Sequence, residues 1–248
     1  MTLAYYGCSE TGSVRENNED ALLLLGENGA ALFLVADGVG GRAHGEVASG
    51  MLRDGYDRWW QDTFLPARDT WDFRQAVEQL RNALVEINRQ VVDRFGHRNA
   101  GSTVVLLFFF QGYCAYLSAG DSRIYRVRGL KVQQMTLDDT VANLPEDARL
   151  NLAGAADGKL VGAVGISDHL EFSLRTDQLE NGDCFFLCSD GVYRCVPAQK
   201  LHDRLRWGGL LSAPRRVVER LCQEVERGGS SDNYTMIFVK VQSSGSDL

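Results

Sequence analysis

The chain has 248 residues, of which 44% are hydrophobic and 24% are charged, and its formal net charge is −7. This composition is ordinary for a globular protein, and the negative charge argues against nucleic acid or an anionic membrane as the main partner, because both favour basic surfaces. No apolar run approaches the ~20 residues of a membrane-spanning helix, and the N-terminus lacks the pattern of a signal peptide. We therefore expect a cytoplasmic protein without membrane contact.

The N-terminal part of the chain predicts three short strands followed by helices. Strands are expected at 3–8, 21–25 and 31–36, where apolar runs end at turn-forming residues. Over 73–95 apolar side chains recur every three or four residues, which predicts an amphipathic helix with one buried stripe. A less regular helix is expected over 43–61.

The middle of the chain predicts an antiparallel meander, because Gly-containing turns separate the next four strands. These strands are expected at 103–110, 113–118, 122–127 and 131–135. Residues 138–168 have weak periodicity and many small or charged residues, so we expect a surface insertion with short helical pieces. The remaining predicted elements are strands at 170–174 and 183–188, a helix at 213–228, a strand at 234–241 and a disordered tail at 242–248.

Together these elements predict an α+β fold, with two antiparallel sheets packed face to face and helices outside. No internal repeat, linker or low-complexity segment occurs, which favours a single domain over residues 1–241. The six cysteines show no C-x-x-C pair and no His at zinc spacing. Free thiols in a reducing compartment are therefore favoured over a disulfide or a zinc site.

Five short acidic motifs stand where strand-like runs meet turns. They are R-E-N-N-E-D at 15–20, V-A-D-G-V-G-G at 35–41, A-G-D-S-R at 119–123, C-S-D-G-V at 188–192 and S-D-N-Y at 231–234. Carboxylates at strand ends from distant segments can converge on one point, and such a buried cluster needs compensating cations. Divalent metal ions with oxygen ligands are the natural partners. With an Arg close by, the pattern indicates a metal centre that handles phosphate.

In this order and spacing the motifs resemble the metal-dependent protein phosphatases of the PPM (type 2C) family, and the resemblance runs from residue 6 to residue 240. It implies a four-layer α-β-β-α sandwich, with residues 138–168 as a flap beside the active site. It also implies that a metal-activated water hydrolyses phosphoserine and phosphothreonine in proteins, with two Mn²⁺ or Mg²⁺ ions and a third in some members. The short chain resembles stand-alone bacterial members, expected here as a monomer, that reverse Hanks-type kinases, some of them in type VI secretion control.

The resemblance assigns roles to individual residues. It implies that Asp37 bridges two metal ions, that Gly38 gives its carbonyl to one of them, and that Asp190 and Asp232 complete the first metal site. Arg15 is implied to hold the substrate phosphate, for which a guanidinium has suitable geometry. For Asp37, an Asx-type turn is the competing interpretation.

Further residues are implied to support the metals. Glu19 and Asp20 would serve the second metal, and the sequence does not separate direct from water-mediated ligation. Asn233 is expected next to the ligands as a supporting residue. Asp121 matches a residue that binds a third, weaker metal in bacterial members, while capping of a β-hairpin turn is its competing role. Arg123 is expected to be a structural partner of a carboxylate.

Two positions depart from the family pattern. Val39 stands where many eukaryotic members have a His that is proposed as general acid, although bacterial relatives commonly have an apolar residue there. The proton donor is therefore unassigned. His44 lies close in sequence, but a surface His at a helix start is the favoured interpretation. Asp139 replaces a His that the family usually has before Thr140, which puts the packing beside the insertion in doubt.

Two other classes of function compete with catalysis. A pseudophosphatase that uses the fold only for binding would lack one or more of the metal carboxylates, and all of them are present. A calcium-binding module is disfavoured because no D-x-[DN]-x-[DN]-G loop occurs in the chain. A cysteine phosphatase is disfavoured because the two-metal mechanism that the resemblance implies requires no Cys nucleophile.

Overall fold

The structure, a computed structural model, describes residues 2–39, 44–146 and 156–242. The strands are β1 (Thr2–Glu10), β2 (Asp20–Glu27), β3 (Ala30–Asp37), β4 (Val104–Phe110), β5 (Tyr113–Ala119), β6 (Arg123–Arg128), β7 (Lys131–Gln134), β8 (Ser173–Gln178), β9 (Cys184–Cys188) and β10 (Tyr234–Gln242). The longer helices are α1 (Gly45–Arg58), α3 (Phe73–Phe95), α6 (Ala198–Leu211) and α7 (Pro214–Arg227). Shorter helical segments are the π-helix η1 (Trp59–Phe64), α2 (Leu65–Ala67), the 3-10 helix η2 (Val141–Asn143) and α5 (Asp190–Tyr193).

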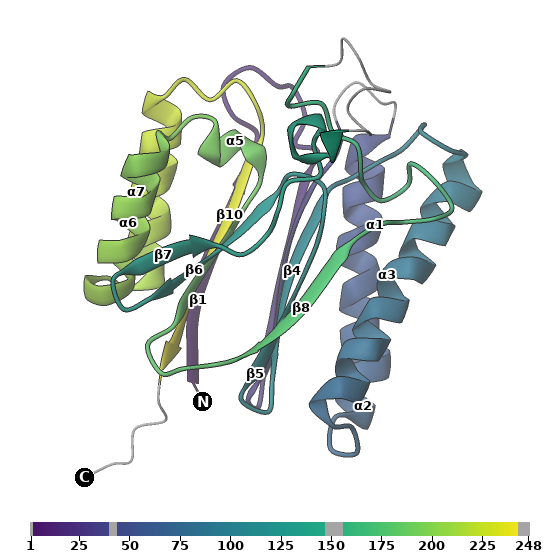
Figure 1. Cartoon of the computed structure of the whole chain (residues 1–248), viewed down its shortest axis with the longest axis horizontal. Helices are drawn as coiled ribbons and strands as arrows, with labels where there is room; N and C mark the ends of the chain where they lie inside the picture. The colour runs from purple at the N-terminus through teal and green to yellow at the C-terminus, as the bar shows by residue number, and fades with distance from the viewer. Residues whose placement is uncertain (1, 40–43, 147–155, 243–248) are drawn as a thin grey trace.

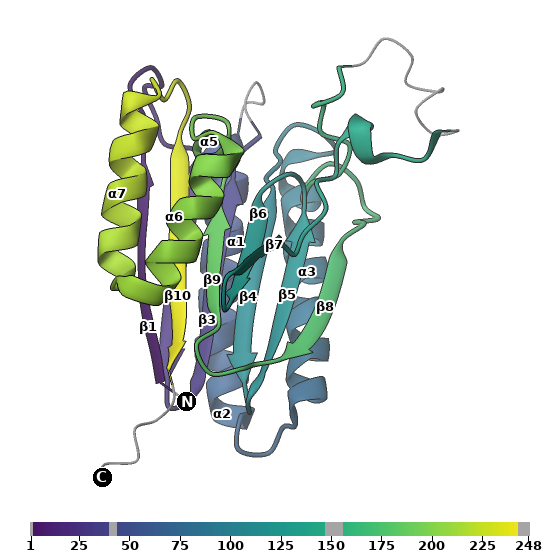
Figure 2. The same cartoon turned by 60° about the vertical axis from the view of Figure 1, so that its left-hand side comes forward.

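The strands form two sheets that lie face to face between layers of helices (Figure 1, Figure 2). Within the described residues each sheet has five strands, in the orders β1-β10-β9-β6-β7 and β2-β3-β4-β5-β8. Every pairing between neighbouring strands is antiparallel. This arrangement confirms the predicted fold class of two antiparallel sheets flanked by helices.

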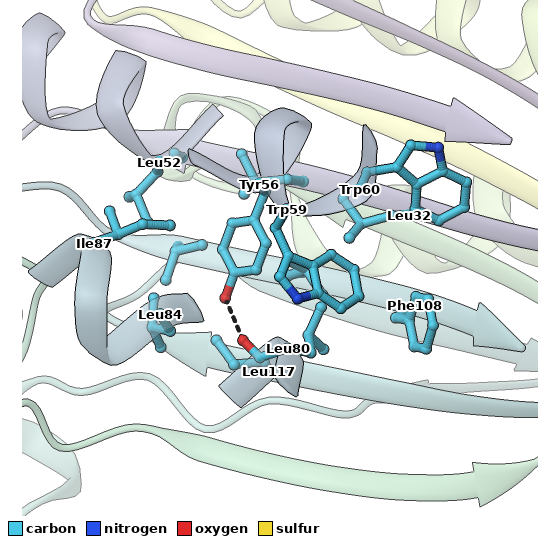
Figure 3. Packing of buried hydrophobic residues seen from close by; sticks show 14 of the residues in the cluster. Leu32, Leu52, Tyr56, Trp59, Trp60, Leu80, Leu84, Ile87, Phe108 and Leu117 are labelled. Atoms are coloured by element: carbon cyan, nitrogen blue, oxygen red, sulfur yellow. Dashed lines mark hydrogen bonds between the residues drawn. The ribbon is translucent and has the colours of Figure 1, made fainter. Parts of the chain in front are cut away.

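Apolar side chains fill each interface between the layers. Between the sheets, Phe33, Phe109 and Phe185 are buried together, and the ring centroids of the last two lie 5.4 Å apart. Outside the second sheet, α1, η1 and α3 cover the strands, and Figure 3 shows Tyr56 and its neighbours packed in this layer. The buried Tyr56 hydroxyl donates to the Leu80 carbonyl at 3.3 Å, so burial leaves no unpaired hydroxyl there. Helices α6 and α7 cover the first sheet in the same way.

The predicted meander is wrong, because its strands divide between the two sheets. Strands β4 and β5 pair in one sheet, whereas β6 and β7 pair in the other. The chain crosses between the sheets at Gly120 and Asp121, so the hairpin-cap role considered for Asp121 does not apply. Gly120 has φ +104°, and a Cβ there would lie 2.7 Å from Thr103 Cβ, so this close crossing requires glycine.

The predicted helices agree with the structure where the apolar residues recur regularly, and they differ from it where this pattern is interrupted. Helix α3 has the predicted bounds, and a capping box between Asp72 and Gln75 fixes its start. The region 43–61 divides into α1 and the first residues of the π-helix η1, and its residue 43 lies outside the described residues. Helix α6 is missing from the prediction, because its buried positions include Gly208 and Gly209, which carry no apolar side chain.

Three segment boundaries differ from the predictions. Strand β8 spans Ser173–Gln178 rather than 170–174. The insertion 138–168 is not surface throughout, since Ala163 and Val164 are buried and Val164 pairs with Ser102. Gln242 still belongs to β10, and the rest of the predicted tail, like 147–155 of the insertion, lies outside the described residues.

All six cysteines are free thiols in the structure. Cys8 on β1 and Cys222 on α7 place their Sγ atoms 2.9 Å apart, a contact that spacing in the sequence does not reveal. No helix among the described residues is long and apolar enough to cross a membrane.

Candidate active site and metal centre

The predicted site residues converge on one end of the sandwich. A cavity of about 290 Å³ opens there, where β3 and β9 end and where the chain crosses from β5 to β6. Its lining includes these predicted residues: Arg15, Asp37, Gly38, Asp121, Asp190 and Asp232. Val39, Thr103, Gly158, Leu160 and Arg194 complete the lining. Glu19, Asp20 and Asn233 are not part of the lining, and their contacts place them directly behind it.

Strand pairing fixes the position of Asp37. It lies opposite Asp20 in the β2–β3 register, and its carbonyl accepts a hydrogen bond from the Thr103 amide at 2.8 Å. The following Gly38 is packed so closely that a Cβ would lie 2.6 Å from the Gly45 carbonyl carbon. Glycine is therefore required here for packing as well as for any approach of the backbone to a ligand.

Asp20 presents a buried oxygen that lacks a partner. Its Oδ2 accepts a hydrogen bond from the Ser189 hydroxyl at 2.8 Å, whereas its Oδ1 is buried with no hydrogen-bond partner. Buried carboxylate oxygens in proteins are normally paired, so this atom is suited to a cation. It is the observation that most favours Asp20 over Glu19 as the direct partner of a metal.

Asn233 fastens its own loop to the loop between β1 and β2 behind the cavity. Its Oδ1 accepts from the Glu19 amide at 2.9 Å, while its Nδ2 donates to the carbonyls of Thr11 at 2.8 Å and Asn17 at 2.9 Å. The Glu19 carbonyl in turn accepts from the Gly38 amide at 3.1 Å. Asn233 thus positions the first acidic motif against the second, the supporting role expected for it.

Two arginines pair with the carboxylates of the cavity. Arg15 Nε lies 2.9 Å from Asp232 Oδ1. Arg194 Nη1 lies 2.8 Å from Asp190 Oδ2, and its Nη2 lies 3.3 Å from Asp121 Oδ2. Sequence reasoning predicted Arg15 but missed Arg194, whose only signal is its position four residues after Asp190, one helical turn further along α5.

Crowding of negative charge perturbs the carboxylates. Burial, together with the charges of Asp20 and Asp190, raises the pKa of Asp37 well above its ordinary value. Burial raises the pKa of Asp20 to about 7, although hydrogen bonds to its carboxylate act in the opposite direction. Burial and the charge of Asp190 raise the pKa of Asp121 to about 6. These groups favour protons when no other cation is present, so the cluster requires positive charge.

Two further carboxylates show the same competition between burial and a neighbouring arginine. Burial raises the pKa of Asp190, although Arg194 opposes the shift. Burial likewise raises the pKa of Glu19, with Arg15 acting against it. In both cases the loss of hydration outweighs a single guanidinium, so the two arginines do not neutralise the cluster by themselves.

The residues fit divalent metal ions in chemistry. Every candidate ligand is an oxygen donor, and the unpartnered Asp20 Oδ1 and the close backbone at Gly38 provide places for a hard cation. Among the described residues, no group of three or more His, Cys, Asp or Glu side chains is arranged to hold a metal ion. Their charges are instead met in part by Arg15 and Arg194.

Residues beside the site have structural contacts. Asp139 Oδ2 accepts from the Gly120 amide at 2.8 Å, so the Asp that replaces the family's His fastens the loop that carries Asp121. Arg123 binds Asp138 with its Nη2 at 2.7 Å, in line with its expected role as a carboxylate partner. The His44 ring packs 4.8 Å from the Phe95 ring, which favours a structural role for it.

A family model described as Protein phosphatase 2C matches residues 11–227. The chain belongs to the protein phosphatase 2C family. Among curated relatives, the serine/threonine protein phosphatase PstP of Mycobacterium tuberculosis is 29% identical over 245 residues, which cover 97% of this chain and 45% of PstP. The chain thus spans about half the length of that relative. The protein phosphatase PhpP of Streptococcus pneumoniae is 26% identical, with 94% of this chain and 95% of PhpP covered.

Solved structures of this family share the fold. PppA, titled a key regulatory component of T6SS in Pseudomonas aeruginosa, is 33% identical, with a TM-score of 0.77 over 96% of this chain and 97% of PppA. The catalytic domain of PstP in complex with two manganese ions is 27% identical, with a TM-score of 0.78 over 97% of this chain and 99% of that domain. The family predicted from the five motifs is therefore confirmed.

Proposed function

We propose that this chain is a metal-dependent serine/threonine protein phosphatase that hydrolyses phosphoserine and phosphothreonine in proteins. The observation that carries this proposal is the convergence of carboxylates from distant segments on one cavity that Arg15 also lines. The names of PstP and PhpP and the two manganese ions in the PstP complex support it. The presence of all the carboxylates favours catalysis over a pseudophosphatase.

The residues divide between holding metal and holding phosphate. Asp37, on the strand end between the other carboxylates, would bridge two Mn²⁺ or Mg²⁺ ions. Asp190 and Asp232 would complete the first site, and Asp20 with the Gly38 carbonyl would serve the second. When bound, such ions supply Lewis acidity, which stabilises charge on phosphoryl oxygens and makes a water molecule more acidic.

Arg15 would bind the phosphoryl group. Its side chain is 40% exposed and lines the cavity, so its guanidinium can reach a phosphate there and form paired hydrogen bonds. Glu19 is held beside it by Asn233 and would act on the second metal through water. A phosphate held by Arg15 in this cavity would lie close to the carboxylate cluster.

Arg15→Ala is expected to raise KM for a phosphopeptide about 10- to 100-fold with a smaller fall in kcat, because the phosphate contact is made in the ground state and the transition state alike. Steady-state kinetics at saturating Mn²⁺ measure both constants. Arg15→Lys keeps the positive charge but loses the planar guanidinium, so its KM should lie between those of wild type and Arg15→Ala. A large fall in kcat at unchanged KM would show that Arg15 acts mainly on the transition state.

Residues 138–168 would form the flap on which a phosphoprotein rests. Gly158 and Leu160 of this segment line the active cavity. A larger cavity of about 350 Å³, distinct from the acidic one, lies between 137–144 and 161–171 and exposes Asp139 and Glu171. We propose one domain over residues 1–241, with this flap as the surface that distinguishes protein substrates from small phosphate esters.

We propose that the chain works as a monomer in the cytoplasm, where the six free cysteines would stay reduced, and opposes a Hanks-type serine/threonine kinase. Type VI secretion control is the proposed pathway, which the similarity to PppA supports.

Purified protein should hydrolyse p-nitrophenyl phosphate and a panel of phosphoserine and phosphothreonine peptides only when Mn²⁺ or Mg²⁺ is present. EDTA should reduce the rate to background, because every proposed ligand is a hard oxygen donor, and added Mn²⁺ should restore it. Full activity in EDTA would exclude the two-metal mechanism. Binding of phosphopeptides without turnover in Mn²⁺ would instead support the pseudophosphatase.

A further inference from the structure

Arg194 makes the most unusual contact in the active cavity. It follows the short helix α5, and its backbone amide donates to the Asp190 carbonyl at 3.0 Å. Its guanidinium turns back into the cavity and lies 2.8 Å from Asp190 Oδ2 and 3.3 Å from Asp121 Oδ2. One cation thus joins Asp190, the first residue of α5, to Asp121 in the crossing between the two sheets.

The partners of Arg194 are fixed from several sides. The Tyr193 hydroxyl donates to the Asp121 carbonyl at 3.0 Å, which ties α5 to the loop between the sheets. The guanidinium of Arg123 lies 3.5 Å above the Tyr193 ring, and Asp138 holds Arg123 in turn. The contact between Arg194 and Asp121 therefore belongs to a connected set of interactions rather than to a chance approach of two loose side chains.

Burial explains why this face of the cavity needs a cation. The Asp121 side chain is only 9% exposed and the Asp190 side chain 13%, so water screens neither charge well. Arg194 is 56% exposed, so its hydrated side chain covers the pair from the solvent side. A divalent ion bound to Asp121 Oδ2 would lie within a few ångströms of the guanidinium and would be repelled by it.

We propose that Arg194 is a built-in cation that occupies the metal-binding face formed by Asp121 and Asp190, so that the chain binds two metal ions and excludes a third. This inference rests on the proposed two-metal function and replaces the third metal that the sequence assigned to Asp121. Arg194 contacts the Asp190 carboxylate at Oδ2. Because Arg194 is part of the chain, it neutralises the charges of Asp121 and Asp190 at any metal concentration.

The test counts bound metal rather than activity. Equilibrium dialysis against Mn²⁺ with metal analysis, and calorimetric titration, give the number of ions per chain and their affinities. Wild type should bind two ions, and Arg194→Gln should gain a third whose affinity is at least about tenfold higher than any residual binding at that position in wild type. The double variant Arg194→Gln/Asp121→Asn should return to two.

Matched variants separate position from charge. Arg194→Lys keeps the positive charge and should still bind two ions. Arg15→Gln removes one positive charge from the same cavity, but its partner Asp232 is 39% exposed, so it should add no third ion. Circular dichroism of each variant should show the wild-type fold, since the Arg15 side chain is 40% and the Arg194 side chain 56% exposed to solvent.

Each outcome decides the proposal. Three ions in wild type, two in Arg194→Gln, or a third ion in Arg15→Gln would each overturn it while the two-metal function stands. A wild-type protein that binds no Mn²⁺ at all would overturn the proposed function itself, and with it this inference. Two ions in wild type, three in Arg194→Gln and two in the double variant would establish it.

Discussion

Asp37→Asn is expected to lower kcat/KM for p-nitrophenyl phosphate by about 10³-fold or more at saturating Mn²⁺. Asp37 lies at the end of β3 opposite Asp20, between the carboxylates of two other segments, so its loss would disturb both proposed metal positions. Stabilisation by a bound metal is worth several kcal/mol, and each ~1.4 kcal/mol corresponds to a tenfold change in rate. Initial rates across a range of Mn²⁺ concentrations measure the effect.

The matched control is Asp93→Asn, which makes the same chemical change on the surface of α3. The Asp93 side chain is 60% exposed and pairs with Arg89, so this variant should keep wild-type rates. Wild-type turnover by Asp37→Asn would be incompatible with the site proposed above. Recovery of activity at very high Mn²⁺ would show instead that the variant binds metal weakly but keeps the chemistry.

The sequence predicted the site better than the path of the chain between its parts. The convergence of Asp37, Asp190 and Asp232 on one cavity was predictable because each stands in a short motif beside a strand end, and strand ends of stacked sheets meet at the same edge. Their roles as metal ligands stay predictions. Local turn signals, however, do not say which sheet the next strand joins. The crossing at Gly120 therefore looked like a hairpin turn, and the meander prediction failed.

Helix α6, the bounds of strand β8 and the contacts of Arg194 were not predicted, because their sequence patterns are weak or depend on residues far apart in the chain. Helix α6 buries two glycines in place of apolar side chains, so its stripe is interrupted. Strand β8 is an edge strand with a largely exposed, polar sequence, so no apolar pattern marks its bounds. Arg194 lies outside every motif, and only the folded structure shows that it reaches Asp121 as well as Asp190.

The raised pKa values predict an unusual dependence of stability on pH in the metal-free protein. The folded-state pKa lies above the ordinary value of 3.8 for Asp121, at about 6, and for Asp20, at about 7. The folded state therefore holds these protons more tightly than the unfolded state. The resulting stability is fully present below about pH 4 and is lost as the pH rises through the folded-state values, so it should fall between about pH 4 and 7.

Asp37→Asn should reduce the loss of stability that the metal-free protein undergoes as the pH rises. Burial and the charges of Asp20 and Asp190 raise the pKa of the Asp37 carboxyl well above the ordinary value, so ionising this group costs the metal-free folded state free energy that the amide does not lose. We expect the variant to raise Tm by about 3–8 °C at pH 8 in EDTA, on the order of 2 kcal/mol for a domain of this size, and to change it little at pH 4.5. Thermal unfolding followed by circular dichroism at both pH values measures the difference.

In saturating Mn²⁺ the order of the two Tm values should reverse, with wild type more stable than Asp37→Asn. Bound metal stabilises the folded state more when it binds more tightly, and wild type should bind Mn²⁺ more tightly than the variant. The same substitution would then abolish turnover, stabilise the metal-free protein and weaken the response to metal. These three effects share one cause, since the charges that bind metal repel one another when it is absent. A metal-free Asp37→Asn protein that is less stable than wild type at pH 8 would mean that Asp37 serves the fold more than the metals.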